Sequence, residues 1–310
     1  MELLLAVLAV IAGMVLLEAG ADKLTDAVQS LATRLRSSEA VVGLLTVGGE
    51  WEELVVVVVA ALTGHIEIGI GNIIGSCIAN LAGSLPLGML WSRKLIPDRA
   101  AKIYSVVMLI ATALATGVLW KGMNTGEGWL LVAAFVVYWS SLPLVIARGW
   151  LPSSAAEEES EEGNSLVMLA IILASLLVLA LGAELVVRGS AEIARRLGVS
   201  EYAIGATIVA IGTTLPDKAI SLVGGMKGSS GVVLANATGS NIFVLTLLLG
   251  LSAILGGAGG SSIGIDMWLL LGVSIAVTVM ILRERLGRVE GALLLLFYAA
   301  YIAYALWRGA

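Results

Sequence analysis

The sequence predicts an all-helical, polytopic membrane protein with ten transmembrane helices arranged as two inverted five-helix repeats. Three observations support this fold class. The composition is more apolar than that of a soluble chain, since 59% of the 310 residues are hydrophobic, 13% are charged and the mean hydropathy is +1.00. Ten apolar stretches are long enough to cross a bilayer. The first half of the sequence also recurs, in weaker form, in the second half.

The same composition limits the classes of function. A single cysteine, Cys77, cannot form an intramolecular disulfide bond, and a single histidine, His65, excludes a metal centre with several histidines. The sequence has no basic stripe of the kind that binds nucleic acid. We expect neither an enzyme nor a covalently bound cofactor, and the lipid bilayer is the first expected partner. The oligomeric state is left open, with a monomer as the simplest expectation.

The apolar stretches are read as membrane-spanning helices because a bilayer core of about 30 Å needs about 20 apolar residues per helix. The first stretch is too long and too polar at its end to be a cleaved signal peptide, so we interpret it as a retained helix. The second carries three acidic residues near its start. The expected spans are 3–28, 41–63, 69–92, 101–120, 127–147, 165–187, 201–225, 231–255, 264–282 and 289–307.

The distribution of Lys and Arg predicts the orientation of these spans in a prokaryotic-type cell membrane. Loops after odd-numbered spans, counted with the span ends beside them, hold twelve of these residues, whereas loops after even-numbered spans and the C-terminus together hold five. Both termini are therefore expected outside the cytoplasm. In this scheme the basic cluster from Arg188 to Arg196 falls in an outer loop.

An internal repeat decides the expected architecture. Residues 20–39 match residues 182–201 at an offset of 162, and after a two-residue shift Glu53 matches Asp217 at an offset of 164. Each copy contains five spans, so the second copy enters the membrane from the opposite side, a frequent plan among secondary transporters. We expect a first repeat over 1–148, an acidic linker over 149–164 and a second repeat over 165–310.

Several charged residues fall inside the expected spans. Glu50, Glu52 and Glu53 lie in the second span, and Asp217 and Lys218 lie in the seventh. Carboxylates in hydrocarbon are costly, and two that meet at a pseudo-two-fold axis repel each other unless a cation or protons lie between them. A pair between Lys218 and one acid that merely joins helices is the simpler reading. One lysine cannot neutralise four acids, however, so a cation site is the stronger interpretation.

The residues around these acids supply oxygen ligands. Pro216 removes an amide donor just before Asp217, which frees backbone carbonyls. Asn72 and Asn236 add side-chain oxygens within glycine-rich stretches, where small residues also allow helices to pack closely. Ca²⁺ takes six to eight oxygen ligands of these kinds. We therefore expect inorganic cations as binding partners.

The motifs resemble those of the cation/Ca²⁺ exchanger superfamily, in particular prokaryotic Na⁺/Ca²⁺ exchangers. Residues 212–217 (GTTLPD) are similar to the family motif Gly-Thr-Ser-x-Pro-Glu, and residues 71–78 (GNIIGSCI) to its second motif, Gly-Asn-x-x-Gly-Ser-Asn. The asparagine of the second motif follows the acid of the first by nineteen residues in both halves of this sequence. The resemblance covers essentially the whole chain.

This resemblance implies a central divalent-cation site with flanking Na⁺ sites. It implies that Glu53 and Asp217 are the central carboxylates and that Asn80 contributes a side-chain amide. Hydroxyl groups would serve the flanking ions. The candidate metal-site residues are Glu50, Glu53, Asn72, Ser76, Asn80, Thr213, Thr214, Asp217, Asn236 and Ser240, with Glu52 and Lys218 as modulating residues.

The sequence departs from the family motifs at several positions. In the first half, Glu50 stands in the place of a hydroxyl residue and Glu52 in that of the proline. In the second half, Asp217 replaces the longer glutamate and Lys218 follows it directly. Glu50 and Glu53 are three residues apart, so they share a helix face and Glu50 adds a protonatable group to it. Lys218 adds an internal cation where Na⁺ would bind.

We expect a secondary active antiporter that exchanges a divalent cation, Ca²⁺, for Na⁺ by alternating access around a carboxylate site near the bilayer midplane. A second reading is an H⁺-coupled exchanger that uses protonation of Glu50, Glu53 and Asp217. A third reading is a channel-like or non-transporting member with Lys218 as an internal counter-ion.

Overall fold

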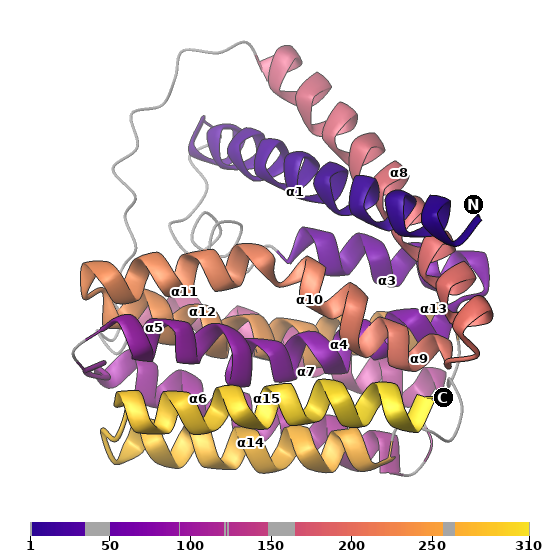
Figure 1. Ribbon diagram of the computed structural model, residues 1–310. Helices are drawn as coiled ribbons and strands as arrows, with labels where there is room; N and C mark the ends of the chain where they lie inside the picture. Colours follow the sequence, from indigo (N-terminus) through magenta and orange to yellow (C-terminus); the bar gives the residue numbers. More distant parts are fainter. Residues whose placement is uncertain are drawn as a thin grey trace.

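The described secondary structure is helical throughout and agrees with a polytopic membrane protein. The structure is a computed structural model that describes residues 2–34, 50–92, 94–120, 122, 124–147, 165–256 and 264–309. Among these residues, seven helical segments are long and apolar enough to cross a membrane, and up to eight when a bent pair of helices is taken as one. Figure 1 shows most of them running side by side.

The elements follow the expected apolar stretches closely. In chain order they are α1 (Glu2–Arg34), α3 (Trp51–Thr63), α4 (Ile66–Ala79), η1 (Asn80–Ser84), α5 (Leu85–Trp91), α6 (Arg99–Trp120), α7 (Thr125–Ala147), α8 (Ser165–Leu197), α9 (Glu201–Ile204), η2 (Gly205–Val209), α10 (Ala210–Thr213), α11 (Leu215–Lys227), α12 (Ser230–Phe243), η3 (Val244–Leu248), α13 (Leu249–Gly256), α14 (Gly264–Leu282) and α15 (Arg288–Gly309). The three η elements are π-helical turns inside longer helical segments.

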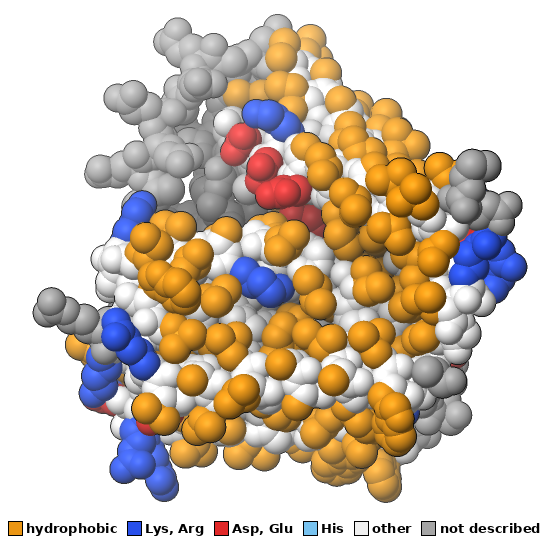
Figure 2. Space-filling model, in the orientation of Figure 1, with side chains coloured by type: hydrophobic (Ala, Val, Ile, Leu, Met, Phe, Trp, Pro, Cys, Tyr) orange, Lys and Arg blue, Asp and Glu red, His pale blue; other side chains and the backbone are white. Residues whose placement is uncertain are grey.

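Two long helices, α1 and α8, form a pair across the outside of the molecule (Figure 1). Their backbones approach closely, since a Cβ added to Gly13 would lie 2.6 Å from the carbonyl oxygen of Gly182. Small residues at a helix interface permit this approach in a membrane. The outward faces of both helices carry exposed leucines such as Leu4 and Leu177, and Figure 2 shows hydrophobic side chains spread over this side of the molecule.

The centre of the fold is built around α4, η1 and α5. In the most apolar window of this segment 89% of the residues are buried, compared with 28% for α1 and for α8. The backbone of α4 packs directly on α9 and η2, because a Cβ added to Gly71 or to Gly75 would lie 2.3 Å from the carbonyl oxygen of Tyr202 or Ala206. The glycines of the 71–78 motif therefore allow two helical segments from different halves of the chain to touch.

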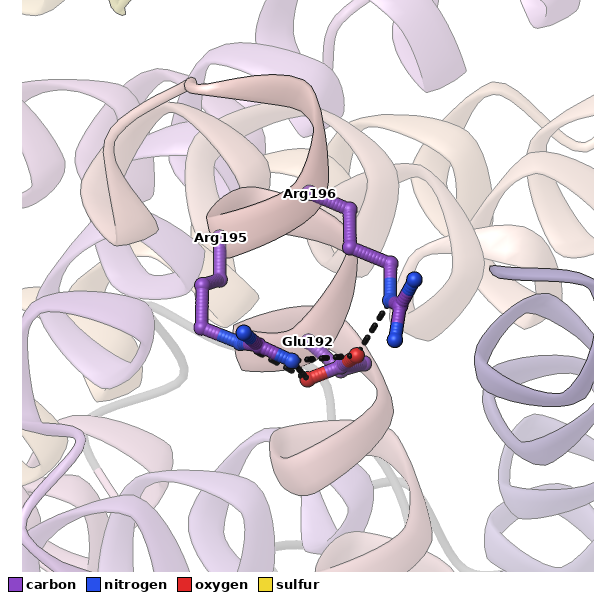
Figure 3. Close-up of polar contacts among 3 residues, drawn as sticks. All are labelled: Glu192, Arg195 and Arg196. Carbon is purple, nitrogen blue, oxygen red and sulfur yellow. Dashed lines mark hydrogen bonds and ion pairs between the residues drawn. The ribbon is translucent and has the colours of Figure 1, made fainter. Parts of the chain in front are cut away.

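The end of α8 corrects one expectation. The span was expected to stop at residue 187, with Arg188 to Arg196 in a loop, but the helix continues to Leu197. Pairs of opposite charge three and four residues apart support the extension: Arg188 lies 2.8 Å from Glu184, and Glu192 accepts hydrogen bonds from Arg195 and Arg196 (Figure 3). Gly198, at φ +68°, then ends the helix.

Two other expectations lie outside the described residues. The acidic linker at 149–164 is one of them, and the start of the second span, residues 41–49, is the other. The described part of that span is α3, which has 13 residues.

Candidate cation site

The site is assembled from the first turns of two helices. Glu53 is the third residue of α3 and Asp217 is the third residue of α11, so the matched acids of the two repeats occupy the same position in their helices. Glu50 directly precedes α3. The N-terminal end of a helix favours negative charge because its backbone N–H groups are unpaired and its dipole is positive there. Each helix start can therefore hold a carboxylate inside the protein.

The three carboxylates converge in the interior. Glu50, Glu53 and Asp217 each offer an oxygen that lies within 4.8 Å of the others. Their exposed fractions are 8%, 1% and 7%. Both carboxylate oxygens of Glu53 lack a hydrogen-bond partner among the described residues. Buried carboxylates this close together repel each other, and a shared cation or bound protons would relieve the repulsion.

A neutral polar network connects α4 to α10. The hydroxyl of Thr213 donates a hydrogen bond to Oδ1 of Asn72 at 3.1 Å, and the hydroxyl of Ser76 lies 3.4 Å from each of them. All three side chains are buried, and Nδ2 of Asn72 has no partner among the described residues. The structure thus brings together three residues that the motifs predicted separately.

The amides of the second half and of η1 are also buried. Nδ2 of Asn236 lies 3.5 Å from the backbone oxygen of Asp217, which fixes α12 beside the start of α11. The hydroxyl of Ser240 has no partner among the described residues, and neither has Nδ2 of Asn80, whose Oδ1 accepts a bond from Ser84 at 3.5 Å. Unpaired buried polar atoms are uncommon in folded proteins, so the hydroxyl of Ser240 is a candidate for contact with an ion or water, and Nδ2 of Asn80 for donation to water or a carboxylate.

Lys218 is not paired with the acids in the way that the simpler sequence reading supposed. Its Nζ donates to the hydroxyl of Thr214, to the backbone oxygen of Thr214 at 3.3 Å and to that of Ile211 at 3.3 Å. These partners are all neutral oxygens. The hydroxyl of Thr214 also donates to the backbone oxygen of Ala210 at 2.6 Å. Both the amine and this hydroxyl are therefore engaged at the end of α10.

The helical segment is interrupted and bent just before Lys218, as the position of Pro216 predicted. The segment from Glu201 to Thr213 and the helix from Leu215 to Lys227 meet at an angle of 47°. Pro216 has no N–H, so the carbonyl of Gly212 loses its usual helical donor. An irregular backbone at membrane depth is tolerated where it is covered by protein or lines a wet cavity. The break therefore leaves the carbonyl of Gly212 outside the regular helical ladder, one turn before Asp217 in the chain.

A cavity of about 250 Å³ lies between α1 and the starts of α3 and α11. Glu18 of α1, Glu52 of α3, Thr213 and Pro216 contribute to its lining. Figure 2 shows acidic side chains gathered in the hollow between α1 and α11. Glu18 was not singled out from the sequence, although a carboxylate within the first apolar stretch was a usable signal. The cavity reaches from this acidic side to the Thr213–Asn72 network.

Sequence reasoning also missed the π-helical turns. η1 begins at Asn80 and η3 at Val244, which are equivalent positions at the repeat offset of 164. π-helical turns are rare and often accompany functional sites. Asn241, just before η3, donates through Nδ2 to the carbonyl of Cys77 at 3.0 Å and so joins α12 to α4. Hydropathy patterns alone contain no signal for such turns.

Comparison with known proteins relates both halves of this chain to sodium/calcium exchangers and to an antiporter. A family model described as sodium/calcium exchanger protein matches residues 5–141 and, again, residues 167–307. The putative antiporter CaxA of Alkalimonas amylolytica is 31% identical over 96% of this chain and 98% of its own length. The sodium/calcium exchanger MaX1 of Methanosarcina acetivorans is 25% identical over 94% of this chain and 95% of its own.

A solved structure of the sodium–calcium exchanger NCX_Mj, soaked with Na⁺ and Sr²⁺, is also similar to this chain. It superposes with a TM-score of 0.65 at 28% sequence identity, covering 97% of this chain and 98% of the other. The likeness therefore extends over both halves of the molecule.

Proposed function

Because the chain belongs to the sodium/calcium exchanger protein family, we propose that it is a secondary active antiporter that moves Ca²⁺ across the membrane in exchange for Na⁺. The family consists of transporters rather than catalytic enzymes. The observation that carries the proposal is the convergence of Glu50, Glu53 and Asp217 from the starts of two helices.

The proposed architecture is ten spans in two inverted halves, residues 1–148 and 165–310, joined by the acidic linker. Two observations support it. The family model matches once in each half, and the start of α3 corresponds to the start of α11 at the repeat offset. In an inverted repeat the two halves can exchange conformations, which gives alternating access to a site between them.

The proposed divalent site lies between Glu53 and Asp217, with Glu50 as a third carboxylate. Ca²⁺ needs more oxygens than these acids alone provide. We assign the additional ligands to Asn80, Asn236 and Ser240, and to the network of Asn72, Ser76 and Thr213. This assignment is supported by the hydroxyl oxygen of Ser240, which is buried and lacks a partner among the described residues. Thr214 acts differently, because Lys218 engages its hydroxyl.

The cavity beside α1 is the proposed route by which cations reach the site. Its acidic lining, with Glu18 and Glu52, attracts cations toward the carboxylates through favourable electrostatics. We propose that movement of the α1–α8 pair opens and closes this route, since α1 lines the cavity directly and the pair packs outside the rest of the helices.

Coupling to H⁺ instead of Na⁺ is a second candidate, and one observation favours it. Glu50 provides a third carboxylate at a position where the family motif has a hydroxyl, and three acids this close can share protons. The variant Glu50→Gln separates the two couplings. It is expected to abolish Ca²⁺ uptake driven by a pH gradient and to retain part of the uptake driven by Na⁺ if Na⁺ is the co-transported ion.

The channel-like and non-transporting alternatives depend on Lys218 neutralising the acids. The amine donates to neutral oxygens of Thr214 and Ile211 rather than to the carboxylates, so its charge offsets part of theirs while their oxygens remain open to a mobile cation. A channel would also conduct Ca²⁺ without any counter-ion.

The test is ⁴⁵Ca²⁺ uptake into proteoliposomes that contain the purified protein. An outward Na⁺ gradient or a pH gradient is expected to accelerate uptake at least about tenfold over vesicles without a gradient, and Glu53→Gln is expected to remove this acceleration. Uptake that responds to neither gradient would refute the exchanger proposal, and fast uptake without a gradient would indicate a channel.

A further inference from the structure

The balance of fixed charges at the site bears on how many ions are exchanged. Glu50, Glu53 and Asp217 contribute three negative charges within 4.8 Å, and Lys218 contributes one positive charge from the residue next to Asp217. The formal sum is −2. Glu52 is not among the three converging carboxylates and lines the cavity with Glu18. It is therefore left out of this sum.

Lys218 occupies an oxygen-lined position of its own. Its ammonium donates to one hydroxyl and two backbone carbonyls at the end of α10, all from residues within seven positions in the chain. Hydroxyl and carbonyl oxygens are also the groups that surround small hard cations in proteins. The ammonium is tethered by its own side chain, so unlike a free ion it cannot leave during transport.

The two repeats carry charges of opposite sign at non-equivalent positions around the site. At the repeat offset of 164, Thr214 corresponds to Glu50 and Lys218 corresponds to Leu54. The first half therefore has an additional carboxylate where the second half has a hydroxyl, and the second half has an ammonium where the first half has a leucine. The additional negative charge of one half is offset by the additional positive charge of the other.

We propose that Lys218 is a built-in monovalent cation that takes the place of one mobile co-ion, so that the site exchanges one Ca²⁺ for two monovalent cations without net charge movement. An uncompensated charge inside a membrane protein is costly, so the occupied states that neutralise the fixed charge are favoured. A fixed charge of −2 is neutralised by one divalent or by two monovalent cations. This inference rests on the proposed function and adds its stoichiometry.

The test combines isotopic flux with current measurement on a solid-supported membrane. The wild-type protein is expected to take up ⁴⁵Ca²⁺ in response to an outward Na⁺ gradient and to produce no current above that of empty membranes. With the potential held near zero by a permeant anion, a tenfold Na⁺ gradient should accumulate Ca²⁺ about 100-fold, compared with about 1,000-fold for three ions. If protons drive uptake, a pH gradient of one unit replaces the Na⁺ gradient.

Two variants probe the lysine itself. Lys218→Met leaves a fixed charge of −3, so any remaining flux is expected to carry current and to acquire a steeper, third-order dependence on the monovalent ion. Lys218→Arg keeps the positive charge, and its flux should stay electrically silent.

A wild-type current coupled to Ca²⁺ flux, or an accumulation near 1,000-fold, would overturn the inference while leaving the exchanger proposal intact. The absence of gradient-driven flux in the wild type would overturn both. If Lys218→Met is inactive, the current and the Ca²⁺ accumulation measured for the wild type still test the stoichiometry.

Discussion

The proposed cation site depends on Glu53 more than on any other residue. It is 1% exposed, and neither of its carboxylate oxygens has a hydrogen-bond partner among the described residues. A buried carboxylate in a stable protein is normally paired or hydrogen-bonded, because its desolvation is otherwise uncompensated. The missing partner is therefore expected to be the transported cation or a proton.

Replacing Glu53 with glutamine tests this interpretation at a single residue. Glu53→Gln keeps the shape of the side chain and removes one of three mutually repelling charges, so the ion-free variant should unfold at a higher temperature than the ion-free wild type. Ca²⁺ at a concentration 100 times its Kd should stabilise the wild type by about 2.7 kcal/mol, and the variant by far less. Thermal unfolding in detergent, with and without Ca²⁺, measures both effects.

The matched control is Asp26→Asn, which removes a carboxylate whose side chain is 70% exposed on α1. It should retain the full Ca²⁺-dependent rise in the unfolding temperature. An equal rise in Glu53→Gln and in the wild type would exclude Glu53 as a ligand.

The effect of pH on ion binding follows from the same carboxylates. Ca²⁺ binds the ionised forms of Glu50, Glu53 and Asp217, and protons compete for the same oxygens. Lowering the pH is therefore expected to weaken Ca²⁺ binding, and Ca²⁺ binding is expected to release protons. Isothermal titration calorimetry in buffers of different ionisation enthalpy counts the released protons. A Ca²⁺ affinity that stays constant as the pH falls would contradict the assignment.

An ion pair between Lys102 of α6 and Glu284, which lies in the turn after α14, predicts a different dependence on pH. The hydrogen bond that Nζ of Lys102 donates to Glu284 at 2.7 Å, together with the charge of the lysine, holds the pKa of Glu284 below its usual range. Because the folded-state pKa is lowered, the pair stabilises the protein above the ordinary pKa of glutamate, and this contribution is lost as the pH falls through the lowered pKa. The pair is exposed, so its effect is small.

Comparing Glu284→Gln with the wild type measures this contribution. The variant should unfold at a slightly lower temperature at neutral pH, and the difference should disappear in acid. A difference that grows as the pH falls would show that the sign is wrong.

At the scale of elements, the apolar stretches predicted the helices well. The described helical segments follow the expected spans, except that α1 runs to Arg34 instead of residue 28 and α8 continues to Leu197 through charge pairs on its surface. The bend before α11 was also predictable, because Pro216 cannot supply a backbone donor. The π-helical turns were not predictable from hydropathy, and the partners of Lys218, although they lie within seven positions in the chain, depend on the local geometry of the bend before α11.

The crossing of α4 with α9 and η2 predicts an effect on stability. In Gly75→Ala the new methyl group would lie 2.3 Å from the carbonyl oxygen of Ala206, so the two segments must move apart. Overpacking of this kind typically costs about 1–3 kcal/mol. The control is Gly117→Ala in α6, where an added Cβ would meet nothing within 4 Å.

Thermal unfolding should therefore show a clear loss of stability for Gly75→Ala and no loss for Gly117→Ala, because alanine is the better helix former. Transport should also fall in Gly75→Ala, since the motif that holds Asn72 and Ser76 would be displaced. Equal unfolding temperatures for the two variants would show that the close approach is not required.

At the scale of the whole molecule, basic residues from several turns gather at one end of the helix bundle. The turn between α5 and α6 contacts that between α14 and α15, since the amide of Leu95 donates to the carbonyl of Leu286 at 3.3 Å. The amide of Ile96 also donates to Ser230 at 3.0 Å, which adds the turn between α11 and α12 to this end. The basic residues of these turns include Lys94, Lys227, Arg283, Arg285 and Arg288.

This end lies opposite the C-terminus in Figure 1, and Figure 2 shows basic side chains gathered there. An excess of Lys and Arg marks the cytoplasmic side of a membrane protein. The C-terminus is therefore expected outside the cytoplasm. Alkaline phosphatase fused after Ala310 should be active, and a fluorescent protein fused at the same position should stay dark. The reverse pattern would show that the orientation is wrong.

The internal repeat predicted the cluster of acids but not the cavity that Glu18 lines. Matching Glu53 with Asp217 predicted that acids from distant parts of the chain lie together, and the structure places oxygens of Glu50, Glu53 and Asp217 within 4.8 Å of one another. The repeat did not indicate that Glu18 of α1 lines a cavity beside them, because that contact depends on how the α1–α8 pair packs on the rest of the molecule.

The most direct test of the central claim is an anomalous difference map from crystals grown with Sr²⁺, a divalent ion that scatters strongly and resembles Ca²⁺. We predict one strong peak bridging the carboxylates of Glu53 and Asp217. The distances from Sr²⁺ to the carboxylate oxygens should equal or slightly exceed the about 2.3–2.6 Å that Ca²⁺ shows. The peak should be absent from crystals of Glu53→Gln. A map with no peak between these two carboxylates at saturating Sr²⁺ would contradict the account.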